Sequence, residues 1–184
     1  MILFHGGALF GDLTLHSTDF ALLVLRLGLA VVFLAHGINH IFGGGKIAGT
    51  ARWFESLGMK PGILHGWTAS LTEIGSGVLL AIGLLTPIAA AGVVGTMLVA
   101  LITNHLHNGF FIFRPGEGWE YVATLTLVAI VVGTLGPGYW SVDGHVGALQ
   151  DLWGWPGFGI AAGVGALGAA GLLVTFWRPE RKSA

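Results

Sequence analysis

Histidine, carboxylate and amide side chains lie inside the apolar stretches of this chain, where most positions hold aliphatic residues. His36 and His40 are four residues apart, so a helix places both of them on one face. Glu73 lies in the next apolar stretch, and Asn104 and His105 lie near the end of the third. A charge at mid-depth of a membrane span costs on the order of 3 kcal/mol on insertion scales, so such residues indicate function.

A metal ion or a haem is one interpretation of these residues. Neutral imidazole and carboxylate are common ligands of Zn, Cu and non-haem Fe in proteins. Two facing histidines also ligate haem iron. The chain has no compact metal-binding motif of the His-Glu-x-x-His type, so this interpretation requires the fold to bring the side chains together. The predicted metal ligands are His36, His40, Glu73 and His105.

A quinone site is the second interpretation. In a low-dielectric pocket, histidines can bond the carbonyl oxygens of a quinone, and carboxylates can pass the protons that its reduction requires. His36 and His105 are then the hydrogen-bond donors, and Glu73 and Glu120 carry protons. A structural network in which these polar groups bond one another accounts for the same residues and stays open. The predicted cofactor-binding residues are His36, His40, Glu73, Asn104 and His105, and the predicted catalytic residues are Glu73, Glu120 and His105.

Apolar stretches of membrane-spanning length must position these side chains. The 184 residues are 54% hydrophobic and only 9% charged, which excludes a disordered chain and a nucleic-acid binder and indicates an all-α integral membrane protein. Cysteine is absent, so disulfides and thiolate-held clusters are excluded. All six prolines fall at or beside the boundaries of the stretches, where a missing backbone donor is tolerated. The predicted spans are 20–42, 66–86, 88–108, 118–136 and 156–177.

The basic residues predict the orientation of the five spans, because short cytoplasmic loops collect Lys and Arg. They place the N-terminus outside and the C-terminus in the cytoplasm, and the polar residues then lie in the cytoplasmic half. Arg26 is inside the first span, where it either snorkels to the exterior surface or forms a structural pair. The basic residues of the predicted cytoplasmic segments are Lys46, Arg52, Lys60, Arg114, Arg178, Arg181 and Lys182.

The remaining segments flank or connect the spans. We expect residues 1–19 to be an exterior segment, residues near 46–57 to form an amphipathic helix in the cytoplasmic interface, and 178–184 to be a basic cytoplasmic tail. Glycine occurs 32 times, which indicates close helix packing, above all in the fifth span with Gly159 and Gly163. Four histidines in terminal or loop segments are assigned no role: His5, His16, His65 and His145.

Several motifs in order resemble the DoxX family of small membrane proteins over about residues 20–145. The resemblance implies a four-helix membrane bundle and a subunit associated with quinone-linked oxidoreductases such as thiosulfate:quinone oxidoreductase. His40 stands where a lysine is usual in that family, which strengthens the metal or haem interpretation. The motifs are His36-Gly37-Ile38-Asn39-His40, Gly49-Thr50-Ala51-Arg52-Trp53-Phe54, Glu73-Ile74-Gly75-Ser76-Gly77, His105-Leu106-His107-Asn108-Gly109 and Gly136-Pro137-Gly138-Tyr139-Trp140.

The fifth span, 156–177, is an addition to that four-helix core, and we expect it to be peripheral and to offer a surface for a partner protein or a second copy. The hypothesis is a bacterial inner-membrane (plasma-membrane) subunit that binds quinone or a redox cofactor and contacts other redox subunits through the fifth span and the cytoplasmic loops. The alternative is a non-catalytic accessory subunit that stabilises a larger membrane complex, so whether the chain is an enzyme stays open.

Overall fold

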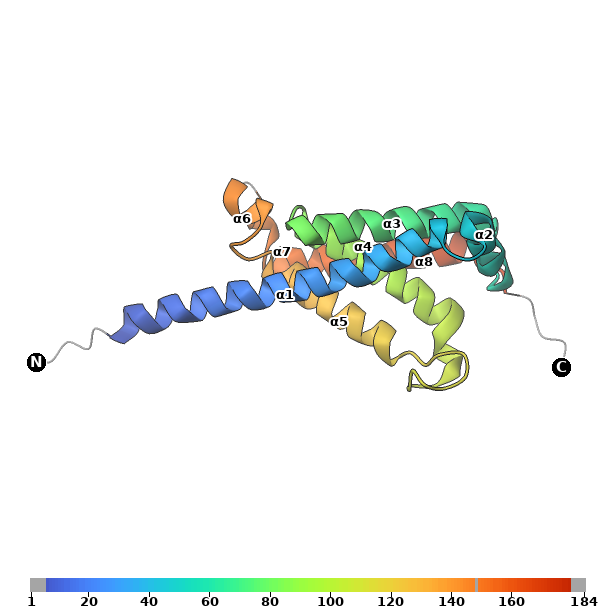
Figure 1. Cartoon of the computed structure of the whole chain (residues 1–184), viewed down its shortest axis with the longest axis horizontal. Coiled ribbons are helices and arrows are strands. Elements are labelled where there is room, and N and C mark those ends of the chain that lie inside the picture. The colour runs from blue at the N-terminus through green and yellow to red at the C-terminus, as the bar shows by residue number, and fades with distance from the viewer. Residues whose placement is uncertain (1–5, 148, 180–184) are drawn as a thin grey trace, which may run out of the picture.

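The computed structural model of the chain describes residues 6–147 and 149–179, with side chains from residue 16 onward. Helices and short connections make up this whole part of the chain (Figure 1). The long helices are α1 (Gly6–Phe42), α2 (Lys46–Ser56), α3 (Gly62–Ile82), α4 (Thr86–Ala100), α5 (Glu120–Leu135) and α8 (Gly165–Phe176). The short turns are η1 (Leu101–His105), η2 (Leu106–Asn108), α6 (Val142–Val146), η3 (Gln150–Leu152), α7 (Trp155–Phe158) and η4 (Gly159–Val164).

Each predicted span corresponds to one of these helical segments, and α2 corresponds to the predicted amphipathic helix near 46–57. The first helix is longer than expected, because α1 begins at Gly6 and the segment 6–19 continues it. The third span ends differently, because its last turns are π-helical in η1 and 3₁₀-helical in η2. Residues 180–184 of the predicted basic tail, like His5, lie outside the described residues.

Three helical segments of the described chain are long and apolar enough to cross a membrane: His16–Phe42, Thr86–Asn108 and Trp155–Phe176. The apolar helix α5 has only 16 residues. The 21 residues of α3 include polar side chains at His65, Ser70 and Glu73, which lower its hydropathy. The chain is therefore a helical membrane protein, whereas the count of five spans and their orientation stay predictions.

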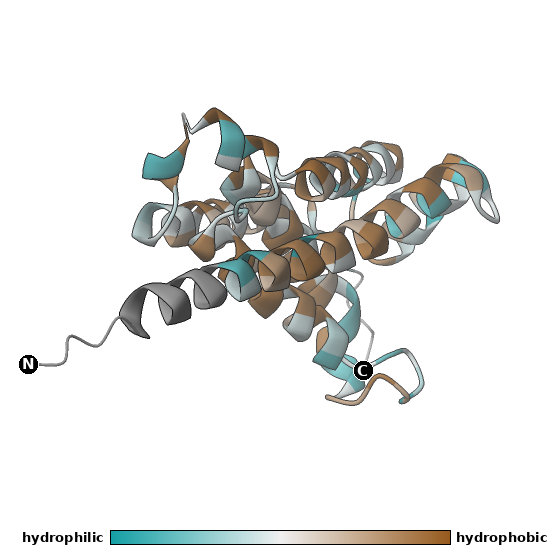
Figure 2. Cartoon of the chain, turned by 60° about the vertical axis from the view of Figure 1, so that its left-hand side comes forward, coloured by the Kyte–Doolittle hydropathy of each residue, from teal (hydrophilic) through white to brown (hydrophobic). Residues whose placement is uncertain are grey.

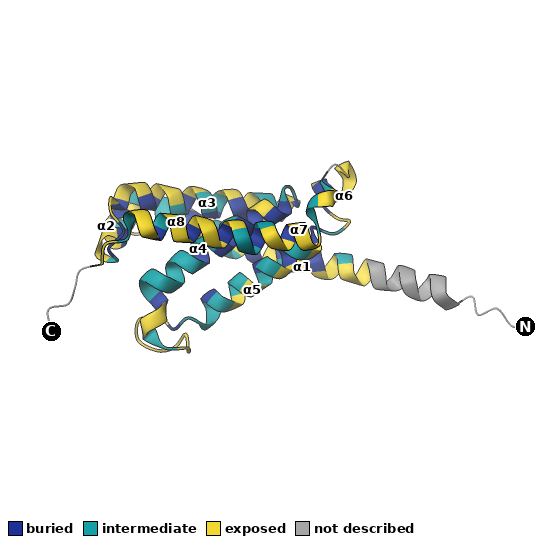
Figure 3. Ribbon diagram, turned by 180° about the vertical axis from the view of Figure 1, so that it is seen from behind, coloured by how far each residue is buried: buried dark blue, intermediate teal, exposed yellow. Residues whose placement is uncertain are grey.

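The buried core forms around α4, which contacts α3, α5, η4 and α8. Its residues are apolar on every side, and such a helix is stable only when other helices surround it. Small residues such as Ala90 and Gly133 let the helices approach closely, and larger side chains such as Phe33 and Val93 fill the space between them. Buried residues accordingly face inward along the bundle (Figure 3), while apolar residues also cover much of its outer surface (Figure 2).

The fifth helical segment packs against the bundle along one face, but it is the least buried of the three membrane-length segments, with 22% of its apolar window buried, so the expectation of a peripheral helix is not contradicted. A Cβ atom at Gly165 would lie 2.8 Å from the backbone oxygen of Ala91, so this glycine allows close contact between α8 and α4. After α8, the indole of Trp177 donates to Leu57 O at 3.0 Å, and Arg178 N donates to Gly58 O at 2.7 Å. These bonds join the end of α8 to the connection between α2 and α3.

Arg26 ties α1 to two other segments at the opposite end of the bundle, so the expectation that it snorkels to the surface is wrong. Its side chain has no exposed surface. Nη1 donates to Leu80 O at 2.8 Å, and Nη2 donates to Trp140 O at 2.7 Å. The guanidinium lies against Gly83, the left-handed C-cap of α3, where a Cβ atom would come within 2.5 Å of Nη1. Arg26 therefore has a structural role, which was the second of the two expectations for it.

Candidate functional site

A cavity of about 600 Å³ lies between α1, α2 and α3 on one side and α4 and η1 on the other. The hairpin formed by η1, the loop 109–119 and the start of α5 stands apart from α1 and α3 (Figures 1 and 3). The walls are mostly apolar and also include residues of α8. The polar lining residues are His36, His40, His65, Thr68, Thr72, Glu73, Thr96, Thr103, Asn104, His105, Glu117 and Tyr121.

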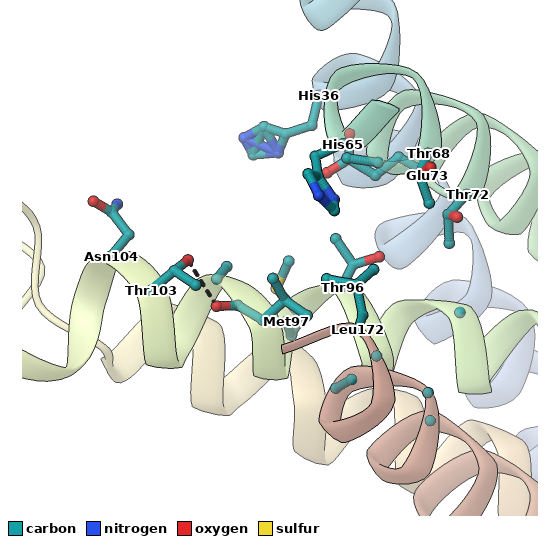
Figure 4. A pocket seen from close by; sticks show the side chains of 18 of the residues that line it. His36, His65, Thr68, Thr72, Glu73, Thr96, Met97, Thr103, Asn104 and Leu172 are labelled. Carbon is teal, nitrogen blue, oxygen red and sulfur yellow. Dashed lines mark hydrogen bonds between the residues drawn. The ribbon is translucent and has the colours of Figure 1, made fainter. Parts of the chain in front are cut away.

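His40 and Glu73 meet on the α1–α3 side of the cavity. Nδ1 of His40 lies 3.1 Å from Oε2 of Glu73, but neither atom has a hydrogen bond of good geometry. Gly37 explains the close approach of the two helices, because a Cβ atom there would lie 2.8 Å from the Ile74 side chain and 2.9 Å from Ser70 O. His36 lies one turn before His40 and points into the cavity (Figure 4). This side therefore carries two imidazoles and a carboxylate that can exchange protons.

His105 anchors a second polar group on the side of η1 and α5. Its Nδ1 lies 2.9 Å from Glu117 O, and its Nε2 lies 3.0 Å from the Tyr121 hydroxyl and 3.2 Å from Nδ2 of Asn104. A carbonyl oxygen only accepts hydrogen bonds, so Nδ1 carries the proton and Nε2 accepts from its two neighbours. The ring is 3% exposed and both nitrogens have partners, so His105 is a fixed member of this group.

The predicted metal site is not supported by the geometry. Among the described residues, no group of three or more His, Cys, Asp or Glu side chains lies close enough to hold a metal ion. His40 pairs with Glu73, whereas both ring nitrogens of His105 already have partners. The four predicted ligands, His36, His40, Glu73 and His105, line one cavity without converging on a common point.

Comparison with known proteins agrees with the sequence motifs. Residues 21–106 match the family model DoxX. The chain carries a DoxX domain. The match includes all of the predicted cofactor-binding residues and ends before the loop 109–119, so the motif at 136–143 lies beyond it. No curated protein and no solved structure shows significant similarity to the chain. DoxX proteins are generally membrane proteins associated with oxidoreductases.

The carboxylate beyond the DoxX domain that lines the cavity is Glu117, whereas the predicted Glu120 is not among the lining residues. Glu120 is the first residue of α5, and its backbone N donates to Phe110 O at 2.9 Å. Glu117 has a left-handed backbone with φ of 62°, and its carbonyl accepts the bond from His105. The backbone of this loop, which no periodicity predicts, decides which glutamate lies at the cavity.

Sequence reasoning missed His65 inside the DoxX domain and Tyr121 beyond it. His65, which was assigned no role, is 3% exposed in the first turn of α3 and lines the cavity. A signal was present, because His65, Ala69 and Glu73 follow one another at intervals of four and therefore share a helix face. Tyr121 resembles an interfacial aromatic residue in sequence, and only the fold brings its hydroxyl to His105.

The fifth helical segment closes the cavity beside the DoxX domain. The cavity lining includes Gly165, Gly168 and Leu172 of α8, whereas the sequence motifs connect this segment only with packing and a partner surface. The predicted close contact at Gly159 and Gly163 is not seen within the described chain, because a Cβ atom at either position would meet nothing within 4 Å.

Proposed function

We propose that this DoxX-domain protein is a membrane subunit of an oxidoreductase that binds a quinone in the cavity between α1, α3 and η1. The observation that carries the proposal is one apolar cavity of about 600 Å³ with polar groups on two opposing sides. Small-molecule sites are typically 300–1,000 Å³, mostly apolar, and contain a few converging polar groups. A quinone fits this chemistry because its ring is apolar and its two carbonyl oxygens accept hydrogen bonds.

The two polar groups have different parts in the proposal. Asn104 has a second amide N–H available as a donor on the η1–α5 side, because only one of its N–H groups and the single O–H of Tyr121 bond Nε2 of His105. His40 and Glu73 form a titratable pair on the α1–α3 side, which can take up or release a proton. His36, which points into the same space, supplies a further imidazole (Figure 4).

The wider setting is part of the same proposal. The connections near 46–60 and the end of α8 meet in space and carry Lys46, Arg52, Lys60 and Arg178, which favours a cytoplasmic location for this end. We propose the inner (plasma) membrane of a bacterium, and redox partner subunits that contact the fifth segment and the cytoplasmic loops. Lipid covers the remaining apolar surface.

The experiment is native mass spectrometry of the protein released gently from its own membranes, with quinone quantified in a matched lipid extract. We expect a quinone bound at about one per chain in the wild type and lost in Glu73→Gln and His36→Gln. Glu120→Gln and His107→Gln are the matched controls, because neither residue lines the cavity. All four variants are compared at equal thermal stability.

The other outcomes separate the alternatives. A metal or haem mass that depends on His36 would replace quinone by that cofactor and overturn the proposal. A bare chain that takes up no added quinone and occurs only in stoichiometric complex with redox subunits would favour the non-catalytic accessory role. The fully bonded ring of His105 is the observation that agrees with that second role, since structural networks have this form.

A further inference from the structure

His65 is the buried polar side chain of the cavity that the proposed quinone chemistry does not use. It lies between two aromatic rings, with centroid distances of 6.3 Å to Phe54 and 5.1 Å to Phe176. It is 3% exposed, and its ring points into the cavity (Figure 4). Its Nε2 is fully buried and has no hydrogen-bond partner among the described residues.

The backbone of Lys60 determines which ring nitrogen of His65 carries the proton. It interacts electrostatically with the His65 ring, and Nε2 has no hydrogen-bond partner among the described residues, so Nδ1 is the nitrogen that it faces. The N–H of Lys60 already donates to Phe176 O at 3.3 Å, so the Lys60 carbonyl is the group that faces His65. A carbonyl accepts, and Nδ1 therefore donates. The neutral ring then presents the lone pair of Nε2 to the cavity.

A buried acceptor atom without a hydrogen-bond donor lowers stability, and the cavity contains a second acceptor of this kind. Oε2 of Glu73 is also buried and lacks a well-oriented hydrogen bond, although it lies near His40. His65 and Glu73 are two helical turns apart on the same face of α3, so both acceptors face the same space. A ligand that has only carbonyl oxygens satisfies neither of them, whereas a hydroxyl group donates to either.

We propose that His65 is a binding residue and that the cavity takes a ligand with a phenolic hydroxyl, which donates to Nε2 of His65. This proposal rests on the proposed function. It implies that the cavity prefers the reduced form of the ligand, the quinol with two hydroxyl groups. Phe54 and Phe176 on either side of His65 suit an aromatic ring. The carboxylate of Glu73 disfavours an anionic ligand and is a second acceptor for a hydroxyl.

The test compares two probes that differ only in the hydroxyl group: 4-nonylphenol and its methyl ether, 4-nonylanisole. Their binding to the full chain in nanodiscs is followed by tryptophan fluorescence, since Trp53 lines the cavity. We expect the phenol to bind roughly five- to ten-fold more tightly than the ether, as one hydrogen bond predicts. His65→Phe removes this difference. His65→Gln retains much of it, because the amide oxygen replaces the acceptor. His107→Phe, outside the cavity, leaves it unchanged.

Decylubiquinone, titrated in parallel, separates this inference from the proposed function. If the quinone binds but the phenol and the ether bind equally in the wild type, the role of His65 is wrong and the quinone site stands. If His65→Phe lowers binding of both probes equally while His65→Gln restores both, His65 acts through packing and the inference is overturned. If none of the three compounds binds, the proposed function itself is wrong.

Discussion

The two ends of the helical bundle bury polar groups in the same apolar surroundings but connect them differently. At one end, both Nη atoms of Arg26 donate to backbone carbonyls, and Asp143 accepts from Thr86 N at 3.2 Å. Nε of Arg26 and Oδ1 of Asp143 are buried there without a hydrogen-bond partner in the described part of the chain, but neither residue lines the cavity. At the other end, His40, Glu73 and His65 each keep a buried atom without a well-formed hydrogen bond, and they line a cavity of about 600 Å³. The first end is bonded to the chain's own backbone, and the second is available to a ligand.

The backbone around each group accounts for the difference. The guanidinium of Arg26 has five donors, and the left-handed end of α3 together with the loop at Trp140 presents carbonyls to it. His65 and Glu73 lie on α3 and His40 lies near the end of α1, and within these helices most backbone carbonyls are already bonded along the helix. The hairpin 101–119 stands away from them (Figure 1), and Nε2 of His65, Nδ1 of His40 and Oε2 of Glu73 have no hydrogen-bond partner among the described residues.

Among the variants that test this comparison, replacement of Arg26 should cause the largest loss in the free energy of unfolding. Arg26→Met removes both Nη hydrogen bonds and leaves the buried carboxylate of Asp143 without its cation, so we expect a loss of about 3–5 kcal/mol in the free energy of unfolding. Thermal and denaturant unfolding in a mild detergent measures it. Arg52→Met, at an exposed position of α2, is the control and should change stability by less than about 0.5 kcal/mol. Equal effects of the two substitutions would refute the structural role of Arg26.

A methyl group at the contact between α4 and α8 should have the next largest effect. Gly165→Ala places Cβ 2.8 Å from both Ala91 O and the Val94 side chain, so the helices must separate, and we expect a loss of about 1–3 kcal/mol. Because Gly165 lines the cavity, ligand affinity should fall as well. Gly171→Ala is the matched control, since nothing lies within 4 Å of its Cβ position. A neutral result for Gly165→Ala in unfolding experiments would mean that α8 is not held against α4.

Removal of the Tyr121 hydroxyl tests the bonded side of the cavity. Tyr121→Phe eliminates one donor to Nε2 of His105, whose other donor Asn104 remains, and we expect a loss of about 1 kcal/mol in stability. Quinone retention should fall at the same time, because the Tyr121 hydroxyl no longer helps to hold His105 and Asn104 in place at the proposed site. Tyr139→Phe, at a position that is 60% exposed, provides the control. If both variants retain quinone equally, the hydroxyl of Tyr121 does not position the binding groups on this side of the cavity.

The smallest effect is expected for Glu120→Gln. Glu120 is half-buried at the start of α5 and does not line the cavity, so both stability and quinone retention should stay within about 0.5 kcal/mol of the wild type. Glu73→Gln at the cavity provides the contrast, with quinone retention lost. If Glu120→Gln lost as much quinone as Glu73→Gln, Glu120 would be a proton carrier as the sequence predicted. The loop arrangement that places Glu117 at the cavity instead of Glu120 would then be wrong.

The places where sequence reasoning succeeded and failed follow the range of the interactions involved. Hydropathy predicted a helical segment for each span, and intervals of four placed His36 and His40 together on α1, because both properties depend on neighbouring residues. The same reasoning assigned no role to His65 and chose Glu120 instead of Glu117. For His65 a periodic signal was present, since it shares a helix face with Glu73, whereas Glu117 depends on a turn that local periodicity does not encode.

The sequence by itself determined a helical membrane protein with a set of polar side chains inside its apolar segments, since composition and helical periodicity suffice for that, and its motifs gave the resemblance to DoxX proteins. Only the tertiary structure decided which of these groups bond the protein itself and which face a cavity. Gly37 and Gly165 set how closely helices approach, and the left-handed backbone at Glu117 turns its carbonyl to His105. The partners of a polar side chain belong to other helices, so a single segment cannot specify them.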